Sequence, residues 1–213
     1  MKEKDVEETL KLAFTKIEPY INFEQGSTVA RVQLTEHKNP VFYNRQPDSD
    51  SRYAHRERKV GVLYLAISPE LALAETFQGD QHSSVSVREI QDRSLHHLKV
   101  TRDLRLADVG RLSAFLGFKP RDLLAAKGQG SEGYRVTQLI STLCMEHSHE
   151  IDGLIYSSSV YAPTGTSAGC NIALFEGRGS QVEPVVAMPL MEAVLPNGET
   201  AIEFLETLSL SVE

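Results

Sequence analysis

The stretch VLYLAISPELALAETF, residues 62–77, decides much of the fold. Its first residues belong to an apolar, β-leaning run over 60–67, which predicts a buried strand. Ser68 can then cap the first free N–H groups of a helix, and Pro69 suits the first helical position. The residues that follow are apolar almost all round, which predicts a buried helix. One carboxylate, that of Glu75, interrupts this apolar helix.

The position of Glu75 requires a physical reason. Burying an ionised carboxylate costs on the order of several kcal/mol unless the group is paired or hydrogen-bonded. In one interpretation Glu75 faces a surface groove or pairs with an arginine for structural reasons. In the other it is a catalytic or ligand-orienting carboxylate. Periodicity does not choose between these two interpretations.

Hydrophobic periodicity elsewhere predicts a mixed set of helices and strands. Helices are predicted over 5–18, in pieces over 111–126, over 131–150 and after a turn at 196–198; strands are predicted over 28–34, twice within 94–109, over 152–159 and 170–176, and once or twice from 182 onward. Residues 35–59 form a long polar segment, and loops of this length are often functional. The chain has no repeat and no linker, so the simplest prediction is one α+β domain over residues 1–213.

Composition narrows the class of protein. The chain has 213 residues, 41% hydrophobic and 24% charged, which is typical of a globular protein with a sizeable core. Its net charge of -7 disfavours nucleic acid as a direct partner, although a local basic pocket for phosphates stays open. No apolar run reaches the ~20 residues of a membrane span, and the start MKEKDVEETL is too charged for a secretory signal. We interpret Cys144 and Cys170 as reduced thiols of a cytoplasmic protein.

Several arginines precede the 62–77 stretch. Arg31 lies in the first predicted strand, and Arg52, Arg56 and Arg58 lie in the long polar loop. A single strand arginine is often a solvated edge residue. Several arginines that converge near a carboxylate would instead suit a phosphate-bearing ligand, because a guanidinium group matches phosphate oxygens bidentately.

Two further clusters have both a structural and a functional interpretation. The hydroxyl-rich run over 156–171 is either a surface loop or the polar wall of a ligand site, and it lacks the spacing of a phosphate loop or a G-x-S-x-G elbow. The run CMEHSHE, residues 144–150, contains metal-ligand residue types, but two of them fit the core face of a predicted helix. His96 and His97 point to opposite faces of a strand and cannot bind one ion together. We predict no metal site.

Residues from these segments occur in an order that resembles the RES domain family, named for arginine, glutamate and serine positions. Members carry an early strand arginine, a second arginine in a loop, a strand–helix block with a glutamate, and later D-G-x-x-Y-x-S and N-x-x-L-F strands. The matching positions are Arg31 in VARVQL, Arg52 in DSRYAH, Tyr64 and Glu75 in VLYLAISPELALAETF, Tyr156 and Ser158 in DGLIYSSS, and Asn171 in CNIALFE. The resemblance spans about residues 28–176, with helical extensions on both sides.

The chain departs from the family pattern in two places. The family often has an aromatic residue and a small turn with glycine just after the second arginine, whereas this chain has the charged run RYAHRERKVG. Arg56 is therefore an alternative to Arg52 at this position. The repeated serines of YSSS make Ser157 an alternative to Ser158, and counting from Tyr156 selects Ser158.

The resemblance implies a toxin that destroys NAD. Its fold would be similar to that of ADP-ribosyltransferases, in which small mixed or antiparallel sheets form an NAD cleft with flanking helices. NAD would be the substrate, with no true cofactor. Such proteins typically pair with an antitoxin that carries a DNA-binding domain.

The resemblance also implies roles for individual residues. Glu75 would stabilise the positive charge that develops on the ribose when nicotinamide leaves. Arg31 and Arg52 would hold the pyrophosphate or an attacking inorganic phosphate. The other expected binding residues are Tyr64 against nicotinamide or ribose, Ser158 at the nicotinamide amide or ribose, and Asn171 in the wall.

Several alternatives stay open at this point. The acceptor of the ribosyl group is water, inorganic phosphate or a protein side chain, and the last would make the chain a mono-ADP-ribosyltransferase. A secreted effector would use the same chemistry as an antitoxin-controlled toxin. A non-catalytic interaction module would keep only the fold. The sequence also leaves open whether the protein forms a homo-oligomer.

Overall fold

The helices and strands of a computed structural model are described for residues 3–46, 51–78, 84–119, 123, 134–161, 163 and 169–213. The helices are α1 (Glu3–Lys16), α2 (Pro69–Phe77), α3 (Val87–Gln91), α4 (Val109–Phe115), α7 (Arg135–His147), α8 (Ala201–Thr207) and the 3₁₀ helix η2 (Leu190–Glu192). The strands are β1 (Tyr20–Phe23), β2 (Thr28–Leu34), β3 (Val62–Ala66), β4 (Ser84–Val85), β5 (Arg93–Val100), β6 (Leu104–Asp108), β7 (Gly153–Ser157), β8 (Cys170–Phe175), β9 (Val182–Pro189) and β10 (Ser211–Val212). The predicted α+β fold class is confirmed.

The short elements β1, β4, α3, η2 and β10 were missed by periodicity. Strand β1 has only four residues and no alternation of buried and exposed side chains. Helix α3 is too short for a periodic pattern, but its capping box was readable, because Ser86 and Glu89 bond each other's backbone N–H groups. The predicted helix over 111–126 is reduced to α4 in the described part, and most of its second half lies outside the described residues. No helix in the described ranges is long and apolar enough to cross a membrane.

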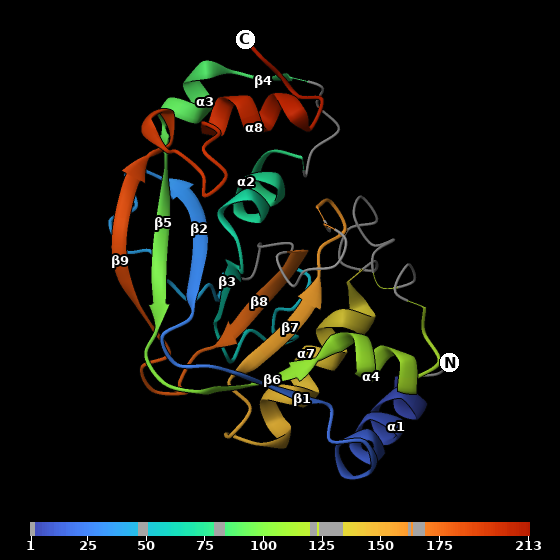
Figure 1. The fold of residues 1–213 in the computed structure, drawn as a ribbon. Coiled ribbons are helices and arrows are strands. Elements are labelled where there is room, and N and C mark those ends of the chain that lie inside the picture. Colours follow the sequence, from blue (N-terminus) through green and yellow to red (C-terminus); the bar gives the residue numbers. More distant parts are fainter. Residues whose placement is uncertain are drawn as a thin grey trace.

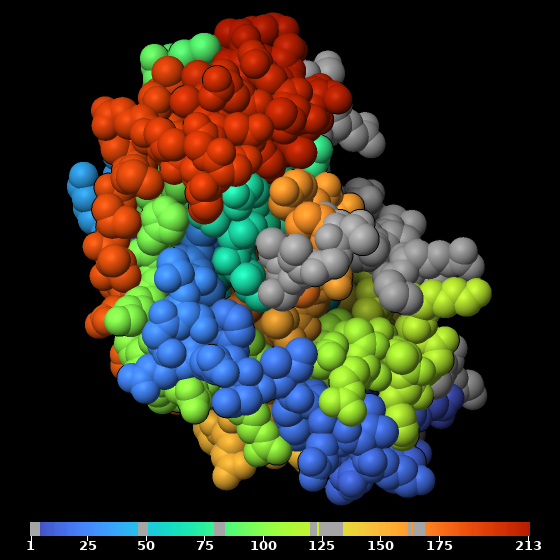
Figure 2. Space-filling view, in the orientation of Figure 1, coloured from blue at the N-terminus to red at the C-terminus, as the bar shows by residue number. Residues whose placement is uncertain are grey.

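Eight strands form one curled, mixed sheet (Figure 1). Its order is β1-β6-β7-β8-β3-β2-β5-β9; β6 and β7 are parallel, and the other neighbours are antiparallel. Helices α1, α4 and α7 pack with the β6–β8 part of the sheet around one hydrophobic cluster. Helices α2, α3 and α8 build a second cluster at the other end, where the C-terminal residues cover the molecule (Figure 2).

The sheet opens between β2 and β3. These two antiparallel strands share a single residue pair, Ala30 with Ala66. On their other sides, β2 pairs with β5 along its whole length and β3 pairs with β8 along its whole length. Each strand is therefore held firmly by its outer neighbour while the two inner edges separate beyond Ala30 and Ala66. This separation leaves space between two well-supported strands.

Helix α2 begins as the sequence predicts. The Ser68 hydroxyl accepts a hydrogen bond of 3.2 Å from the Leu71 backbone N–H, and Pro69 occupies the first turn. Its apolar side chains, from Leu71 to Ala74 and at Phe77, are buried against the second cluster. Glu75 is not buried with them, because its side chain is exposed and lines the opening beside β3.

The loop before β3 is tied down on both sides of Arg52. The Tyr64 hydroxyl shares a 2.5 Å hydrogen bond with the Ser51 hydroxyl and accepts one of 2.9 Å from the Tyr53 backbone N–H. From α7, the Ser141 hydroxyl donates to the Tyr53 carbonyl at 2.6 Å. The backbone at Arg52 is therefore fixed between two anchored residues, although it lies in a loop.

Gly153, the glycine of the D-G-x-x-Y-x-S motif, lies where β7 packs closely against β8. A Cβ atom there would lie 2.4 Å from the Ala173 carbonyl oxygen and 3.0 Å from the Leu174 Cα. These are backbone atoms of the paired strand, so they cannot yield without breaking the ladder. We expect Gly153→Ala to lower the free energy of unfolding by about 1–3 kcal/mol or more in urea titration. Gly110→Ala is the control, since its Cβ would approach only the Asp108 carboxylate; an equal loss in both variants contradicts this account.

The Tyr64 anchor predicts a pH-dependent stability difference. We expect Tyr64→Phe to be less stable than wild type by about 1–3 kcal/mol near neutral pH, because hydrogen-bonding groups of the loop lose their partner. Burial raises the pKa of Tyr64 from 10.0 to about 12. A folded-state pKa above the unfolded one stabilises the protein below about pH 10, and that contribution is lost as pH rises toward 12. The gap between the two proteins should therefore shrink by about 1 kcal/mol near pH 11. Urea titrations at both pH values measure it, and a constant gap contradicts the burial of the Tyr64 hydroxyl that raises its pKa.

Candidate functional site

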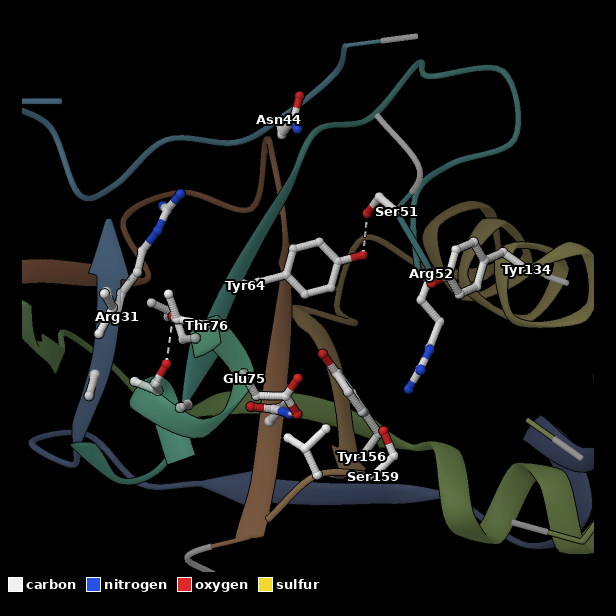
Figure 3. A pocket seen from close by; sticks show the side chains of 17 residues that line it. Arg31, Asn44, Ser51, Arg52, Tyr64, Glu75, Thr76, Tyr134, Tyr156 and Ser159 are labelled. Carbon is white, nitrogen blue, oxygen red and sulfur yellow. Dashed lines mark hydrogen bonds between the residues drawn. The ribbon is translucent and has the colours of Figure 1, made fainter. Parts of the chain in front are cut away.

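The opening between β2 and β3 contains a cavity of about 480 Å³, a size typical of small-molecule sites. Side chains from β2, β3, α2, β7, β8 and the tied loop line it (Figure 3). The small side chains of Ala30, Ala66 and Ala72 also line it, and Ala30 pairs with Ala66 between β2 and β3. The polar lining residues are Arg31, Asn44, Ser51, Arg52, Tyr64, Glu75, Thr76, Tyr134, Tyr156, Ser159 and Asn171.

The Glu75 carboxylate is held by two hydrogen bonds to one oxygen. Asn171 Nδ2 donates to Glu75 Oε1 at 2.5 Å, and Ser158 Oγ donates to the same atom at 2.7 Å. Within the described residues, Glu75 has no ion pair with an arginine. Glu75 therefore faces the groove and has no structural ion pair with an arginine in the described residues, and its catalytic role stays a prediction. The second carboxylate oxygen has no protein partner among the described contacts.

Ser158 supports Glu75 from behind. The backbone N–H groups of Val160 and Tyr161 donate to Ser158 Oγ at 3.0 and 3.1 Å. With both lone pairs of the hydroxyl engaged, its proton is directed to Glu75. Ser158 is buried and does not line the cavity, so the expected contact with nicotinamide or ribose is not the contact that the structure gives it.

The serine alternatives separate clearly in space. Ser157 is exposed at the end of β7, whereas Ser158 contacts the Glu75 carboxylate. The neighbouring Ser159 lines the cavity, although the sequence gave no reason to select it. Alternation places Ser157 and Ser158 on opposite sides of the chain, which is why only one can reach Glu75.

Two arginines flank the cavity. Arg31 projects from β2 and donates to the Pro40 carbonyl at 2.7 Å, while the Arg52 guanidinium lies 5.9 Å from the centre of the Tyr134 ring. Figure 3 shows these two arginines on opposite sides of Glu75. Burial lowers the pKa of Arg31, but an arginine remains cationic at neutral pH. The alternative residue, Arg56, is exposed and does not line the cavity.

The neighbour of Arg31 on β5 is a histidine, not a carboxylate. His96 lies opposite Arg31 in the strand register and is only 7% exposed. Burial and the charge of Arg31 hold the pKa of His96 below its ordinary value. At neutral pH this neighbour is therefore uncharged, and it does not compensate the positive charge that Arg31 presents to the cavity.

Aromatic rings form part of the wall. Tyr64 on β3 and Tyr156 on β7 both line the cavity, and the Tyr156 ring lies 4.4 Å from that of the buried Tyr53. Tyr156 is opposite Asn171 in the strand register, which brings it beside Glu75. Sequence reasoning noted Tyr156 in a motif without giving it a role, although strand alternation predicts that it shares a face with Asn171. Tyr134, which also lines the cavity, left no comparable signal.

The metal-ligand residue types of 144–150 do not converge. Cys144 is fully buried in the first cluster, His147 stacks on Phe14 at 4.2 Å, and His149 contacts Arg178. Among the residues that the structure describes, no three histidine, cysteine or acidic side chains are grouped to hold a metal ion. These residues are accounted for by packing and hydrogen bonding.

Comparisons with known proteins bear on the fold and on the family. A chain in the crystal structure of the M. tuberculosis MbcT–MbcA toxin–antitoxin complex is similar, with a TM-score of 0.64 and 13% identity over 94% of this chain and 95% of that chain. At this identity the similarity shows a shared fold. No curated protein matches the chain. The model of the RES domain matches residues 28–194, a span that extends past the 176 inferred from motifs and takes in β9. The chain therefore belongs to the RES domain family.

Proposed function

We propose that the protein is a toxin that cleaves the nicotinamide–ribose bond of NAD, with water or inorganic phosphate as the acceptor. The observation that carries the proposal is the oriented Glu75 carboxylate in a cavity flanked by Arg31 and Arg52. A single negative group between two positive groups suits a ligand that is anionic at its phosphates and becomes cationic at its sugar.

The chemistry follows from where charge develops. When the C–N bond to nicotinamide breaks, its electron pair leaves with the ring nitrogen, and the nicotinamide becomes neutral. The ribose carbon is left with positive charge, which a fixed carboxylate stabilises best in a water-poor site. An oxygen of water or phosphate then bonds to that carbon, and water also releases a proton. Glu75, held through Oε1, can direct its free oxygen to the ribose.

The arginines supply recognition of the phosphates. A guanidinium group binds phosphate oxygens in a planar, bidentate geometry. Arg52 lies next to the anchored residues Ser51 and Tyr53, so its backbone needs little further ordering on binding. Tyr64 and Tyr156 offer rings against which the nicotinamide or ribose can pack. NAD is then a substrate, and the proposal needs neither a metal nor a covalent enzyme intermediate.

The lining of the cavity favours a small acceptor. Among the described lining residues, Glu75 is the sole carboxylate. While the Glu75 carboxylate stabilises the ribosyl cation, it is not free to take the proton from an attacking protein side chain. Protein ADP-ribosylation and a non-catalytic interaction module remain outcomes of the tests below.

Partner and cellular role are proposed from the relatives. The RES family membership and the fold shared with a chain of a toxin–antitoxin complex support a toxin that is neutralised by an antitoxin. Such an antitoxin carries a DNA-binding domain in the RES pattern. The proposed site of action is the cytoplasm, where NAD is available and Cys144 and Cys170 stay as free thiols.

The proposed role of Glu75 predicts a large loss of activity. Purified protein is incubated with NAD, and free nicotinamide is followed over time. We expect Glu75→Gln to lose at least ~10²-fold in rate, since the neutral amide cannot stabilise the ribosyl cation. Glu70→Gln on the same helix is the control, because Glu70 does not line the cavity; it should stay within about twofold of wild type. Absence of nicotinamide release by the wild type rejects the proposal.

The acceptor is identified by repeating the assay with and without inorganic phosphate. Phosphorolysis makes release dependent on phosphate and leaves a phosphorylated ADP-ribose, whereas hydrolysis does not. Label from NAD that appears on added protein instead identifies a transferase.

Toxicity is predicted to follow the same residue. We expect expression of the wild type in a bacterial host to deplete NAD and stop growth, and Glu75→Gln to abolish both effects. Cellular NAD and culture density are measured together. Growth arrest that persists in a Glu75→Gln culture with normal NAD would place the toxic activity elsewhere.

A further inference from the structure

The C-terminal segment from residue 195 onward lies beyond the residues that the family model matches. It nevertheless packs against α2, the helix that carries Glu75 (Figure 1). Helix α8 buries Phe204 and Leu205 in the same cluster as the apolar face of α2. This contact links the C-terminal segment to the helix that carries Glu75.

The same segment holds the C-terminal end of α2 through polar contacts. Gln78, the residue that caps α2, donates a long hydrogen bond of 3.5 Å to the Leu208 carbonyl just after α8. Strand β10, at the end of the chain, pairs with β4, which follows α2 in the sequence. The C-terminal segment thus contacts α2 along its packed face and at its end.

A second contact involves Tyr161, which follows Ser158, one of the two hydrogen-bond donors to Glu75. The Tyr161 ring meets the Phe204 ring edge-to-face, with centroids 5.5 Å apart and planes at 85°. Burial and the carboxylates of Glu70 and Glu199 raise the pKa of Tyr161, as expected for a ring between the start of α2 and the residues before α8. Such an aromatic pair stabilises by about 0.5–1.5 kcal/mol beyond the area that it buries.

Tyr161 continues directly into the hydrogen bonds that orient Glu75. Its backbone N–H donates to Ser158 Oγ at 3.1 Å, and Ser158 Oγ donates to Glu75 Oε1 at 2.7 Å. The Phe204 ring therefore fixes Tyr161, Tyr161 fixes the Ser158 hydroxyl, and Ser158 fixes the carboxylate. Each step is a direct contact.

We propose that Phe204 and Tyr161 are positioning residues, through which the C-terminal helix α8 sets the orientation of the Glu75 carboxylate. This inference rests on the proposed function, because it assigns a catalytic consequence to that orientation. Neither residue lines the cavity, so their effect is on the chemical step and not on substrate contact. A displacement of about 1 Å at a reacting group can cost roughly 10²-fold in rate.

The first test compares two truncations in the same helix. We expect Phe204→Ala to lower kcat by at least about tenfold with KM changed less than about threefold. Leu205→Ala is the matched control, since Leu205 shares the packing of Phe204 in the cluster between α8 and α2 and has no ring contact with Tyr161; it therefore separates the Tyr161 contact from that packing. It should lose comparable thermal stability while its kcat stays within about threefold of wild type. Equal losses of kcat in the two variants overturn the proposal.

The second test asks whether Phe204 acts through Ser158. In a Ser158→Ala background the relay is already broken, so adding Phe204→Ala should lower kcat by no more than about twofold. A full, multiplicative loss in the double variant overturns the proposal, because it means that Phe204 acts by another route.

A third measurement does not depend on NAD cleavage. Amide hydrogen exchange followed by NMR reports the protection of the Val160 and Tyr161 N–H groups that bond Ser158. We expect Phe204→Ala to reduce this protection and Leu205→Ala to preserve it; unchanged protection in Phe204→Ala overturns the proposal. If the wild type releases no nicotinamide but protection falls as expected, the proposed function fails while the positioning geometry is upheld.

Discussion

The whole site depends on the separation of β2 from β3. Two antiparallel strands that share one residue pair, Ala30 with Ala66, cannot close into a continuous ladder. Each stays in place because β5 and β8 hold the outer edges along their full lengths. Much of the cavity wall is therefore built from strands and from helix α2, and a site on such elements keeps its geometry more precisely than one on loops.

Regular structure also explains how the carboxylate is oriented. Glu75 lies on a capped helix, Asn171 on the central strand β8, and Ser158 just past the end of β7. Two donors converge on one oxygen, and the backbone N–H groups of the turn after Ser158 orient the second donor. The other oxygen is left for a ligand. Arg52, in contrast, lies in a loop and not in a helix or strand. Tyr64 and helix α7 fix this loop by hydrogen bonds.

The RES family model matches residues 28–194, so β9 lies within the match and α8 lies beyond it. The fold itself is shared with a chain that is only 13% identical in sequence. The unmatched C-terminal segment still contacts α2 and Tyr161. A segment beyond the matched residues thereby reaches the residues that orient the Glu75 carboxylate.

The sequence by itself determined the α+β class and the 62–77 strand and helix, and its ordered motifs selected Arg31, Tyr64, Glu75 and Asn171, all of which line the cavity. It predicted neither β1, whose four residues are too few for a period, nor the place of Tyr134 at the cavity. Only the tertiary structure decided that Glu75 faces a groove, that Ser158 rather than Ser157 contacts it, and that Arg52 rather than Arg56 reaches the cavity. The physical reason is that these outcomes depend on which strands separate and which residues meet across the chain, and local periodicity carries no record of such long-range contacts.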